Sequence, residues 1–475
     1  MPFQSGVLNS AVGAGDPKTE YTDGPRNATY QVFQLGSRYY ARSGVTGLID
    51  YDGTDAGTVL QAACDNASTI DPGALALTRP VVLVRPGQFN ISNVKLGGPF
   101  HLKGSGALST TLFSVANNAT AELGLITLKN PTTDKDVEIS DLNIHGNSSN
   151  QSQALDGINL TQTGAAVTDK RHKIQNCWVQ NCKGDGIQVS TRADNTIIFN
   201  TRIQQCDAHG IHENGAADLE VRGCTVYGSG LHGINMAVVG FSHIMNTIVG
   251  NSGRIDAVTN GGDGFAFGSA NCVALACESN DNLRDGVSFT TGQNVYTGTV
   301  QDNVRDHIRI AGGDNYVDVG EVYSGTPATG SLVNFISGTR NSVRVGNPIP
   351  ASTTGAFVTG TVGGNSVDVG STLAMQNISY ATPLTPNPYR GRTIIMTLTG
   401  PLTINSTAPN QHAGQRLRFV FLQDGTGGRV PTFNAQYLMP ATGPTLAINK
   451  SDSIEFEFRS TDGKWVPIGP WVSGV

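Results

Sequence analysis

One tripeptide recurs through the middle of the chain and constrains the fold more than any other feature. It consists of Asp or His, then Gly, then an apolar residue, and it occurs at Asp156-Gly157-Ile158, Asp185-Gly186-Ile187, His209-Gly210-Ile211, His232-Gly233-Ile234, Asp263-Gly264-Phe265 and Asp285-Gly286-Val287. Its first positions are 29, 24, 23, 31 and 22 residues apart. A period of roughly 20–30 residues predicts a solenoid, in which each unit buries its apolar face only against neighbouring units.

A second strand pattern identifies the unit as a coil of a parallel β-helix. Its clearest examples are Asn315 to Val319, Asn341 to Val345 and Asn365 to Val369, in which apolar and polar side chains alternate as a half-buried strand requires. We expect the leading Asn residues to stack as an amide ladder. Gly accounts for 59 of the 475 residues, about twice the ordinary share of roughly 7%, which suits a chain with many tight turns. The predicted fold class is all-β.

The cysteines fall at regular positions relative to the tripeptide. Eight residues before its first position stand Cys177, Thr201, Cys224 and Cys277, with Leu142 and Thr247 at the same place in the two longer steps. Three residues before it stand Cys182, Cys206, Ser229 and Asn282. We expect two buried columns of small residues, with free thiols that favour assembly in a reducing cytoplasm. No His/Cys/Asp/Glu cluster of metal-ligand spacing is evident, so we expect no metal and no cofactor.

The first 135 residues divide into two parts. Residues 1–44 are expected to be an irregular arm, and residues 45–135 to form the cap and first coils of the β-helix. Asp52-Gly53-Thr54-Asp55 precedes a helix with Thr54 or Asp55 as its N-cap, and Leu60-Gln61-Ala62-Ala63 lies in that helix. The strand Val81 to Val84 and its continuation to Phe89 follow. These blocks resemble the right-handed, pectate-lyase-like β-helix family common in phage tailspikes, although Phe89 stands where that family usually has Tyr.

Composition changes near Pro348-Ile349-Pro350 and again between Pro383 and Pro388. We therefore place the parallel β-helix at 136–372 and an antiparallel β-sandwich at 373–475. The expected sandwich strands are Thr393 to Thr399, Arg416 to Leu422 and Ser453 to Phe458, with a last strand near Trp465 and with Phe419, Phe421, Phe456 and Phe458 facing inward. Three blocks resemble a C-terminal module of phage tail proteins: 414–416, 423–429 and 462–465.

These resemblances imply a virion tailspike, a homotrimer that recognises and depolymerises a bacterial surface polysaccharide. The arm at 1–44 would attach it to other virion proteins, and the C-terminal module would serve oligomerisation or glycan binding. A non-enzymatic virion rod, such as a capsid decoration or tail-fibre protein, is the alternative. A cellular lyase or epimerase is disfavoured, because the first six residues lack the features of a signal peptide. The net charge of −6 argues against nucleic acid, and no apolar run suits membrane insertion.

Glycan hydrolysis uses two carboxylates roughly 5–9 Å apart, a distance that residues on adjacent coils meet. Glu213 interrupts an inward column of Val189, Met236, Phe267 and Phe289, so we expect it either to turn outward or to have a raised pKa. The predicted catalytic residues are Glu213, Asp207, Asp218 and Glu220, and the predicted substrate-binding residues are His212, His243, Arg254 and Asp256.

Each of these residues also has a structural interpretation. Glu213 would then pair with Arg222 or Arg202, and the other carboxylates would be ordinary solvated side chains. His209 and His232 replace the turn Asp and are interpreted as turn residues. Asp156, Asp185, Asp263 and Asp285 precede Gly in turns and are predicted to be structural.

Overall fold

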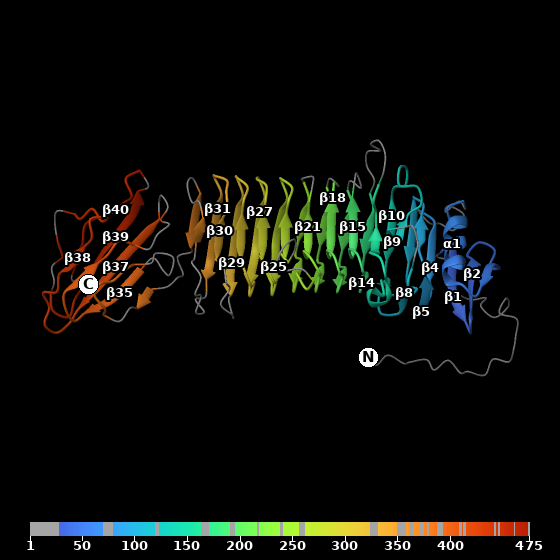
Figure 1. Cartoon of the computed structure of the whole chain (residues 1–475), viewed down its shortest axis with the longest axis horizontal. Helices are drawn as coiled ribbons and strands as arrows, with labels where there is room; N and C mark the ends of the chain where they lie inside the picture. The colour runs from blue at the N-terminus through green and yellow to red at the C-terminus, as the bar shows by residue number, and fades with distance from the viewer. Residues whose placement is uncertain are drawn as a thin grey trace.

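In the computed structural model the repeats stack into a straight parallel β-helix, with a helix at one end and a separate group of strands beyond the other end (Figure 1). The structure describes residues 28–69, 79–118, 123–162, 171–190, 195–215, 218–237, 241–255, 262–323, 331–348, 358–360, 365–369, 375–377, 380–386, 393–407, 411, 415–440, 443–444, 447–459 and 461–473. Within these residues no helix combines the length and the apolarity that crossing a bilayer requires.

Each coil contributes three strands, of which the first two belong to one long sheet, called sheet A here. The first strands are β4 (Val81–Val84), β7 (Phe100–Lys103), β10 (Val137–Ser140), β13 (Lys173–Gln175), β16 (Ile197–Phe199), β19 (Glu220–Arg222) and β22 (His243–Met245). The second strands are β5 (Gly87–Ile91), β8 (Thr110–Ser114), β11 (Asn143–His145), β14 (Trp178–Gln180), β17 (Arg202–Gln204), β20 (Thr225–Tyr227) and β23 (Ile248–Gly250). In the later coils the two merge into β25 (Val273–Asn280), β27 (Val295–Gln301), β29 (Tyr316–Tyr323) and β31 (Ser342–Pro348), followed by β33 (Ser366–Val369).

The third strand of each coil belongs to the opposite sheet, called sheet B here. Its members are β6 (Val94–Leu96), β9 (Gly124–Leu128), β12 (Asp156–Asn159), β15 (Ile187–Ser190), β18 (Ile211–Asn214), β21 (Ile234–Met236), β24 (Phe265–Phe267), β26 (Val287–Phe289), β28 (Ile308–Ile310), β30 (Val333–Phe335) and β32 (Val358–Gly360). Neighbouring strands are parallel in both sheets, so residues one coil apart become direct neighbours. Ile187, Ile211 and Ile234, for example, pair in register and are all buried.

The corners of the coils explain the abundance of Asn. Between the first and second strands one residue has a left-handed φ, namely Asp141, Asn176, Asn200, Gly223, Asn246 or Ala276. After the second strand the left-handed residue is Asn181, Gln205, Gly228, Asn251, Asp281 or Asp302. Asn, Asp and Gly adopt this conformation at the lowest cost, so they mark the bends.

The two columns of small residues are confirmed. All seven cysteines of the chain are buried free thiols, and Thr201, Ser229, Thr247 and Asn282 are buried beside them. The Asn ladder is also confirmed. Backbone amides donate to the Asn side chain of the next coil, from Cys272 to Asn294, Asn294 to Asn315, Asn315 to Asn341 and Asn341 to Asn365, at 2.9–3.0 Å.

The N-terminal cap begins earlier than predicted. Residues 28–44, expected to be irregular, include β1 (Tyr30–Leu35) and β2 (Arg38–Ser43), which form an antiparallel hairpin and continue into β3 (Ile49–Gly53). The two-residue loop Gly36-Ser37 is the hairpin signal that the prediction missed. The remainder of the predicted arm lies outside the described residues.

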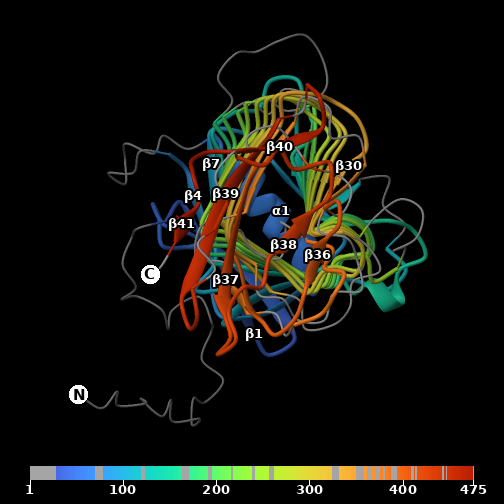
Figure 2. The same ribbon diagram turned by 90° about the vertical axis from the view of Figure 1, so that its left-hand side faces the viewer.

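Helix α1 (Ala56–Ala67) covers the open end of the core, and it lies within the outline of the coils when they are viewed along the stack (Figure 2). Asp55 is its N-cap, since its carboxylate accepts the Thr58 amide at 2.6 Å. The predicted apolar face of Val59, Leu60, Ala63 and Ala67 is buried. Strand β1 pairs in parallel with β4, which joins the cap to the first coil.

The C-terminal strands form a mixed sheet, so the prediction of purely antiparallel strands is wrong. The sheet runs in the order β34 (Met375–Asn377), β35 (Thr393–Leu398), β37 (Arg416–Gln423), β39 (Ser451–Arg459) and β40 (Lys464–Pro467), with β41 (Val472–Ser473) beside β39. Strands β34, β35 and β37 are parallel, because the chain crosses through β36 (Leu402–Ile404) before it re-enters the sheet. Strand β36 pairs with β38 (Pro431–Phe433), and the predicted inward Phe residues are buried in one core shared by both sheets.

Candidate functional site

The first residue of each tripeptide belongs to a continuous hydrogen-bonded ladder, called the turn ladder here. At each step the backbone amide of one ladder residue donates to the side chain of the ladder residue one coil earlier. The steps join Asp185 to Asp156 (2.7 Å), His209 to Asp185 (2.8 Å), His232 to His209 (3.2 Å), Asp263 to His232 (3.3 Å), Asp285 to Asp263 (3.2 Å), Asp306 to Asp285 (3.2 Å) and Ser331 to Asp306 (2.8 Å). The predicted structural role of these Asp and His residues is confirmed.

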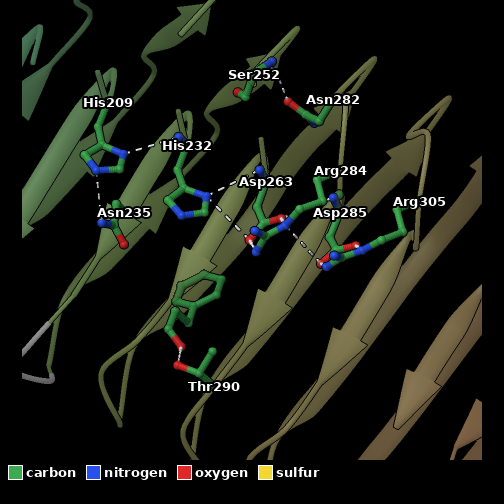
Figure 3. A network of polar contacts seen from close by, with 12 residues as sticks. His209, His232, Asn235, Ser252, Asp263, Asn282, Arg284, Asp285, Thr290 and Arg305 are labelled. Carbon is green, nitrogen blue, oxygen red and sulfur yellow. Dashed lines mark hydrogen bonds and ion pairs between the residues drawn. The ribbon is translucent and has the colours of Figure 1, made fainter. Parts of the chain in front are cut away.

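In the later coils each buried ladder carboxylate is compensated by an arginine. Asp263 accepts from Arg284 Nε at 2.7 Å and from Arg284 Nη2 at 2.9 Å, and Asp285 pairs in the same way with Arg305. Each arginine directly precedes the next ladder residue, so the pairs repeat from coil to coil (Figure 3). Such bidentate pairing suits carboxylates that have almost no contact with solvent.

The earlier coils lack this arginine. The residues that directly precede the ladder residues Asp185 and His209 are Gly184 and Ala208. A Cβ atom on Gly184 would lie 2.2 Å from Asp156 Oδ1, so the backbone itself approaches this carboxylate. Asp185 instead accepts a hydrogen bond from His212 Nδ1 at 2.8 Å. This histidine comes from the outer face of β18 and is partly exposed.

Asp156, Asp185, His209 and His212 are called the His–Asp cluster here. The His209 and His212 rings lie 4.6 Å apart, and the His209 ring stacks on His232 at 5.3 Å. The ligand atoms of Asp185, His209 and His212 all lie within 4.8 Å of one another, so these three side chains could hold a metal ion. The prediction that no such cluster exists rested on sequence spacing, whereas the stacking of coils brings residues 24 positions apart together.

Burial and charge separate the pKa values within the cluster. Burial, together with the charge of Asp185, raises the pKa of Asp156 to about 7. Burial opposes protonation of His212, but its hydrogen bond and attraction to Asp185 prevail and raise the pKa of this imidazole. Burial lowers the pKa of His209 to about 3 and that of His232 to about 4. Groups with separated pKa values in one place are typical of acid–base sites.

Glu213, the first predicted catalytic residue, remains inside the β-helix. Its side chain has no solvent exposure, and its residue pairs in register with Val189 and Met236. Its Oε1 atom accepts the Gly215 amide at 2.8 Å. The structural interpretation of Glu213 was an ion pair with Arg222 or Arg202. Arg222 instead pairs with Glu220, and Arg202 lies over the Trp178 ring. A polymer outside the coil does not reach the Glu213 carboxylate in this conformation.

Two further predicted residues meet on the outside of a turn. Arg254 Nη2 lies 2.8 Å from Asp207 Oδ1, and Lys183 Nζ lies 3.1 Å from Asp207 Oδ2. Arg254 Nε also donates to the Gly228 carbonyl at 3.2 Å. Asp207 is therefore held between two cations and stabilises the turn. The predicted residue Asp256 lies outside the described residues.

Of the remaining predicted residues, Glu220, His243 and Asp218 lie on sheet A or at its edge. Glu220 of β19 and His243 of β22 pair in register, as the repeat alignment predicted, and both reach the outer face. Asp218 is exposed at a left-handed corner that precedes β19. His212 lies on sheet B, so the predicted residues do not form one site.

Sequence reasoning missed Asp156 and Asp185 as site residues because it treated all turn carboxylates alike. The available signal was the residue one coil after each carboxylate, just before the next ladder position. It is Arg284 for Asp263 and Arg305 for Asp285, but Gly184 for Asp156 and Ala208 for Asp185.

The strand order, the register and the family comparison define the class of the protein. Residues 126–323 match the family model for the right handed beta helix region. The fold is thus a right-handed parallel β-helix with additional strands at both ends. No curated protein matches the sequence.

Solved structures with a similar fold include enzymes and phage proteins. The A-module of mannuronan C-5 epimerase AlgE6 from Azotobacter vinelandii is 16% identical, with a TM-score of 0.51 over 80% of this chain and 95% of that one. The AlgE4 A-module from the same organism is 16% identical, with a TM-score of 0.47 over 66% and 92%. Tailspike protein 2 of an Escherichia coli O157:H7 bacteriophage is 12% identical, with a TM-score of 0.41 over 74% and 40%. At 16% identity the AlgE6 A-module supports the fold alone, and function has to be argued from the site.

Proposed function

We propose that this chain is a virion tailspike that recognises a bacterial surface polysaccharide and cleaves it at the His–Asp cluster. The observation that carries the proposal is the Asp185–His212 pair, whose 2.8 Å hydrogen bond joins two adjacent coils on the outside of sheet B. Asp185 acts as the positioning residue, and His212 acts as the catalytic acid or base. Both hydrolysis and β-elimination of a glycan require such a proton transfer.

The orientation of His212 supports this role. Its Nδ1–H donates to Asp185, which holds the neutral ring in the tautomer whose lone pair is on Nε2. The raised pKa of His212 favours the protonated ring, which is the form that can donate a proton to a leaving group. The His212 side chain is 18% exposed, so a ligand lying on sheet B can reach it.

Amide side chains next to His212 support glycan binding. Asn159, Gln188, His212 and Asn235 pair in register from coil to coil and form one row along sheet B, in which Asn159 is buried and the other three are partly exposed. Asn159 Nδ2 donates to Gln188 Oε1 at 2.7 Å, which fixes the orientation of both amides. With coils about 4.8 Å apart, the row offers a regular series of hydrogen-bonding groups to the hydroxyl groups of a polymer.

The trimer and the virion attachment belong to the same proposal. Exposed apolar side chains on the outer face of sheet A, including Phe199, Ile248 and Leu275, support association of three chains along their length. Attachment to other virion proteins through residues 1–44, and oligomerisation or glycan binding through residues 373–475, rest on the resemblance to phage tail proteins.

The test is to incubate the purified full chain with capsule and lipopolysaccharide from candidate hosts and to measure new reducing ends and unsaturated uronates. We expect Asp185→Asn to lower the rate by about 100-fold or more, because the Asn oxygen preserves the turn ladder but does not stabilise imidazolium. Asp306→Asn, the same change at a distant ladder position, serves as the matched control. Glu213→Gln should retain activity, since its side chain is enclosed.

Full activity in Asp185→Asn, or loss of activity in Glu213→Gln without a change in melting temperature, would reject the His–Asp cluster as the site. Glycan binding with no product from any host glycan would instead favour the non-enzymatic rod. The second predicted pair, Glu220 and His243, would then be tested as a binding site by substituting both with Ala.

A further inference from the structure

We propose that the His–Asp cluster binds a divalent transition-metal ion of the zinc type, which takes the place that the guanidinium groups of Arg284 and Arg305 have in later coils. The inference goes beyond the proposed function and concerns a second state of the same cluster. A His212 ring that holds the ion cannot also act as the catalytic acid or base, so we expect the ion-bound chain to be inactive in the proposed glycan cleavage. It is based on a comparison between coils of the same chain. All of them contribute to the turn ladder, but the ladder carboxylates pair with arginine in the later coils and not in the earlier ones.

The first step concerns charge. Asp156 and Asp185 are 7% and 6% exposed, and they occupy the ladder positions that correspond to Asp263 and Asp285. A buried carboxylate needs a positive partner or a proton. Asp263 and Asp285 have arginines for this purpose, whereas Gly184 and Ala208 provide no charge at the equivalent positions. Asp185 has the imidazole of His212 as its partner instead, and a cation bound beside both would supply the positive charge.

The second step concerns the ligand atoms. Atoms bound to one zinc ion at about 2.0–2.2 Å lie at most about 4 Å apart. The ligand atoms of Asp185, His209 and His212 already lie within 4.8 Å of one another, so small side-chain rotations complete the set. The His209 side chain makes two long hydrogen bonds, at 3.2 Å from the His232 amide and 3.5 Å from Asn235 Nδ2, besides its ring contacts with His212 and His232. Binding the ion would therefore exchange one weak ladder bond for a bond to the metal.

The third step concerns the kind of ion. Two imidazole nitrogens and one carboxylate oxygen suit zinc and related ions, whereas Ca²⁺ and Mg²⁺ prefer oxygen ligands. Three protein ligands leave a fourth position open on the outer side of the coil, where His212 is partly exposed.

Binding is tested with the EDTA-treated full chain by isothermal titration with ZnCl₂ in the absence of glycan. We expect one ion per chain, a rise in melting temperature with zinc, and no competition from MgCl₂ or CaCl₂. His209→Asn and His212→Asn should each weaken zinc binding by at least tenfold. His243→Asn, on the other face of the β-helix, is the matched control and should bind zinc as the wild type does. Circular dichroism verifies that each variant is folded.

A second variant tests the comparison between coils directly. Ala208→Arg restores the arginine of the later coils next to Asp185, so it should abolish zinc binding and raise the melting temperature of the zinc-free chain. The proposal is overturned if the wild type binds no zinc, or if folded Ala208→Arg or His212→Asn binds zinc with unchanged affinity. None of these outcomes depends on glycan cleavage, so the two proposals can fail separately.

Discussion

At the scale of single residues, the glycine of each tripeptide is explained by close packing rather than by an unusual φ. A Cβ atom on Gly186 would lie 2.5 Å from Ile203 Cγ2, 2.6 Å from the Gly210 carbonyl oxygen and 3.0 Å from Cys206 Sγ. The same contacts recur one coil later at Gly210, against Val226 and Ser229. Sheet B approaches the inner columns so closely at this point that no larger residue fits.

We therefore predict that Gly186→Ala lowers the free energy of unfolding by about 2 kcal/mol, because an added methyl group overpacks a dense core. The measurement is urea denaturation followed by circular dichroism. Gly320→Ala in β29 is the control, since its Cβ would meet only the Gly298 carbonyl oxygen at 4.0 Å. Equal stability of the two variants would show that the coils can separate to accommodate the methyl group.

At the scale of elements, the turn ladder connects the coils along one edge of sheet B and uses both Asp and neutral His as acceptors. His232 accepts the Asp263 amide through Nδ1, which requires the lone pair of an unprotonated ring nitrogen. Four charged or titratable groups face this ring, namely Asp263, Arg284, His209 and His212. Burial, with Arg284 and His212 adding to it, lowers the pKa of His232 to about 4.

The sign of the resulting pH dependence follows from this lowered pKa. An unfolded imidazole has a pKa of about 6.5, so between about pH 6.5 and 4 the unfolded chain binds more protons and His232 makes stability fall as pH falls. His232→Asn keeps an acceptor for the Asp263 amide but does not titrate. We expect the melting temperature of the wild type to fall more between pH 7 and 5 than that of His232→Asn.

Comparing variants is necessary because Asp156, whose pKa is raised to about 7, changes stability in the opposite direction over the same range. His243→Asn, an exposed site on sheet A, is the control and should follow the wild type. Parallel curves for wild type and His232→Asn would mean that protonation of His232 does not open the ladder.

At the scale of the whole molecule, the stack forms a rod, and one column of side chains on the outer face of sheet A includes exposed apolar residues. Phe199, Arg222, Met245 and Leu275 occupy one column across four coils. Phe199 is 44% exposed and Leu275 is 39% exposed. Apolar side chains aligned along a rigid face form a surface on which identical chains can pack.

If three chains associate through this column, the double variant Phe199→Asp/Leu275→Asp should be monomeric under conditions in which the wild type is trimeric. Size-exclusion chromatography with light scattering measures the mass directly. Ile336→Asp is the control, because Ile336 is 46% exposed directly after β30 of sheet B, on the other sheet of the β-helix. A monomeric wild type, or a double variant that remains trimeric, would contradict association through this face.

Repetition explains why so much of the fold was predictable. In a solenoid the neighbours of Cys177 or Asn315 lie one period away, so alignment of the repeats gives the contacts directly. The ends of the chain do not repeat, and there the predictions were less accurate. The β1–β2 hairpin was missed, and the parallel pairing of β35 with β37 depends on a crossover through β36.

The candidate site was predicted only in part for a related reason. His212 was identified, and the match of Glu220 with His243 is confirmed. The sequence left open whether Glu213 turns outward or stays inside, and it did not indicate that the buried Asp185 pairs with His212. Glu213 follows the alternation of strand β18 and stays inside, whereas the Asp185–His212 pair depends on the distance between two coils.

The sequence by itself determined the period, the columns and the all-β class of this protein, because these depend on local alternation and regular spacing. Only the tertiary structure decided which carboxylates have a cationic partner. Asp263 and Asp285 meet an arginine from the next coil, whereas Asp185 meets His212 and lies near His209. A cation stabilises a carboxylate only when the two groups lie a few ångströms apart in space. The paired residues here are about twenty or more positions apart in the chain, so only the folded structure shows which of them meet.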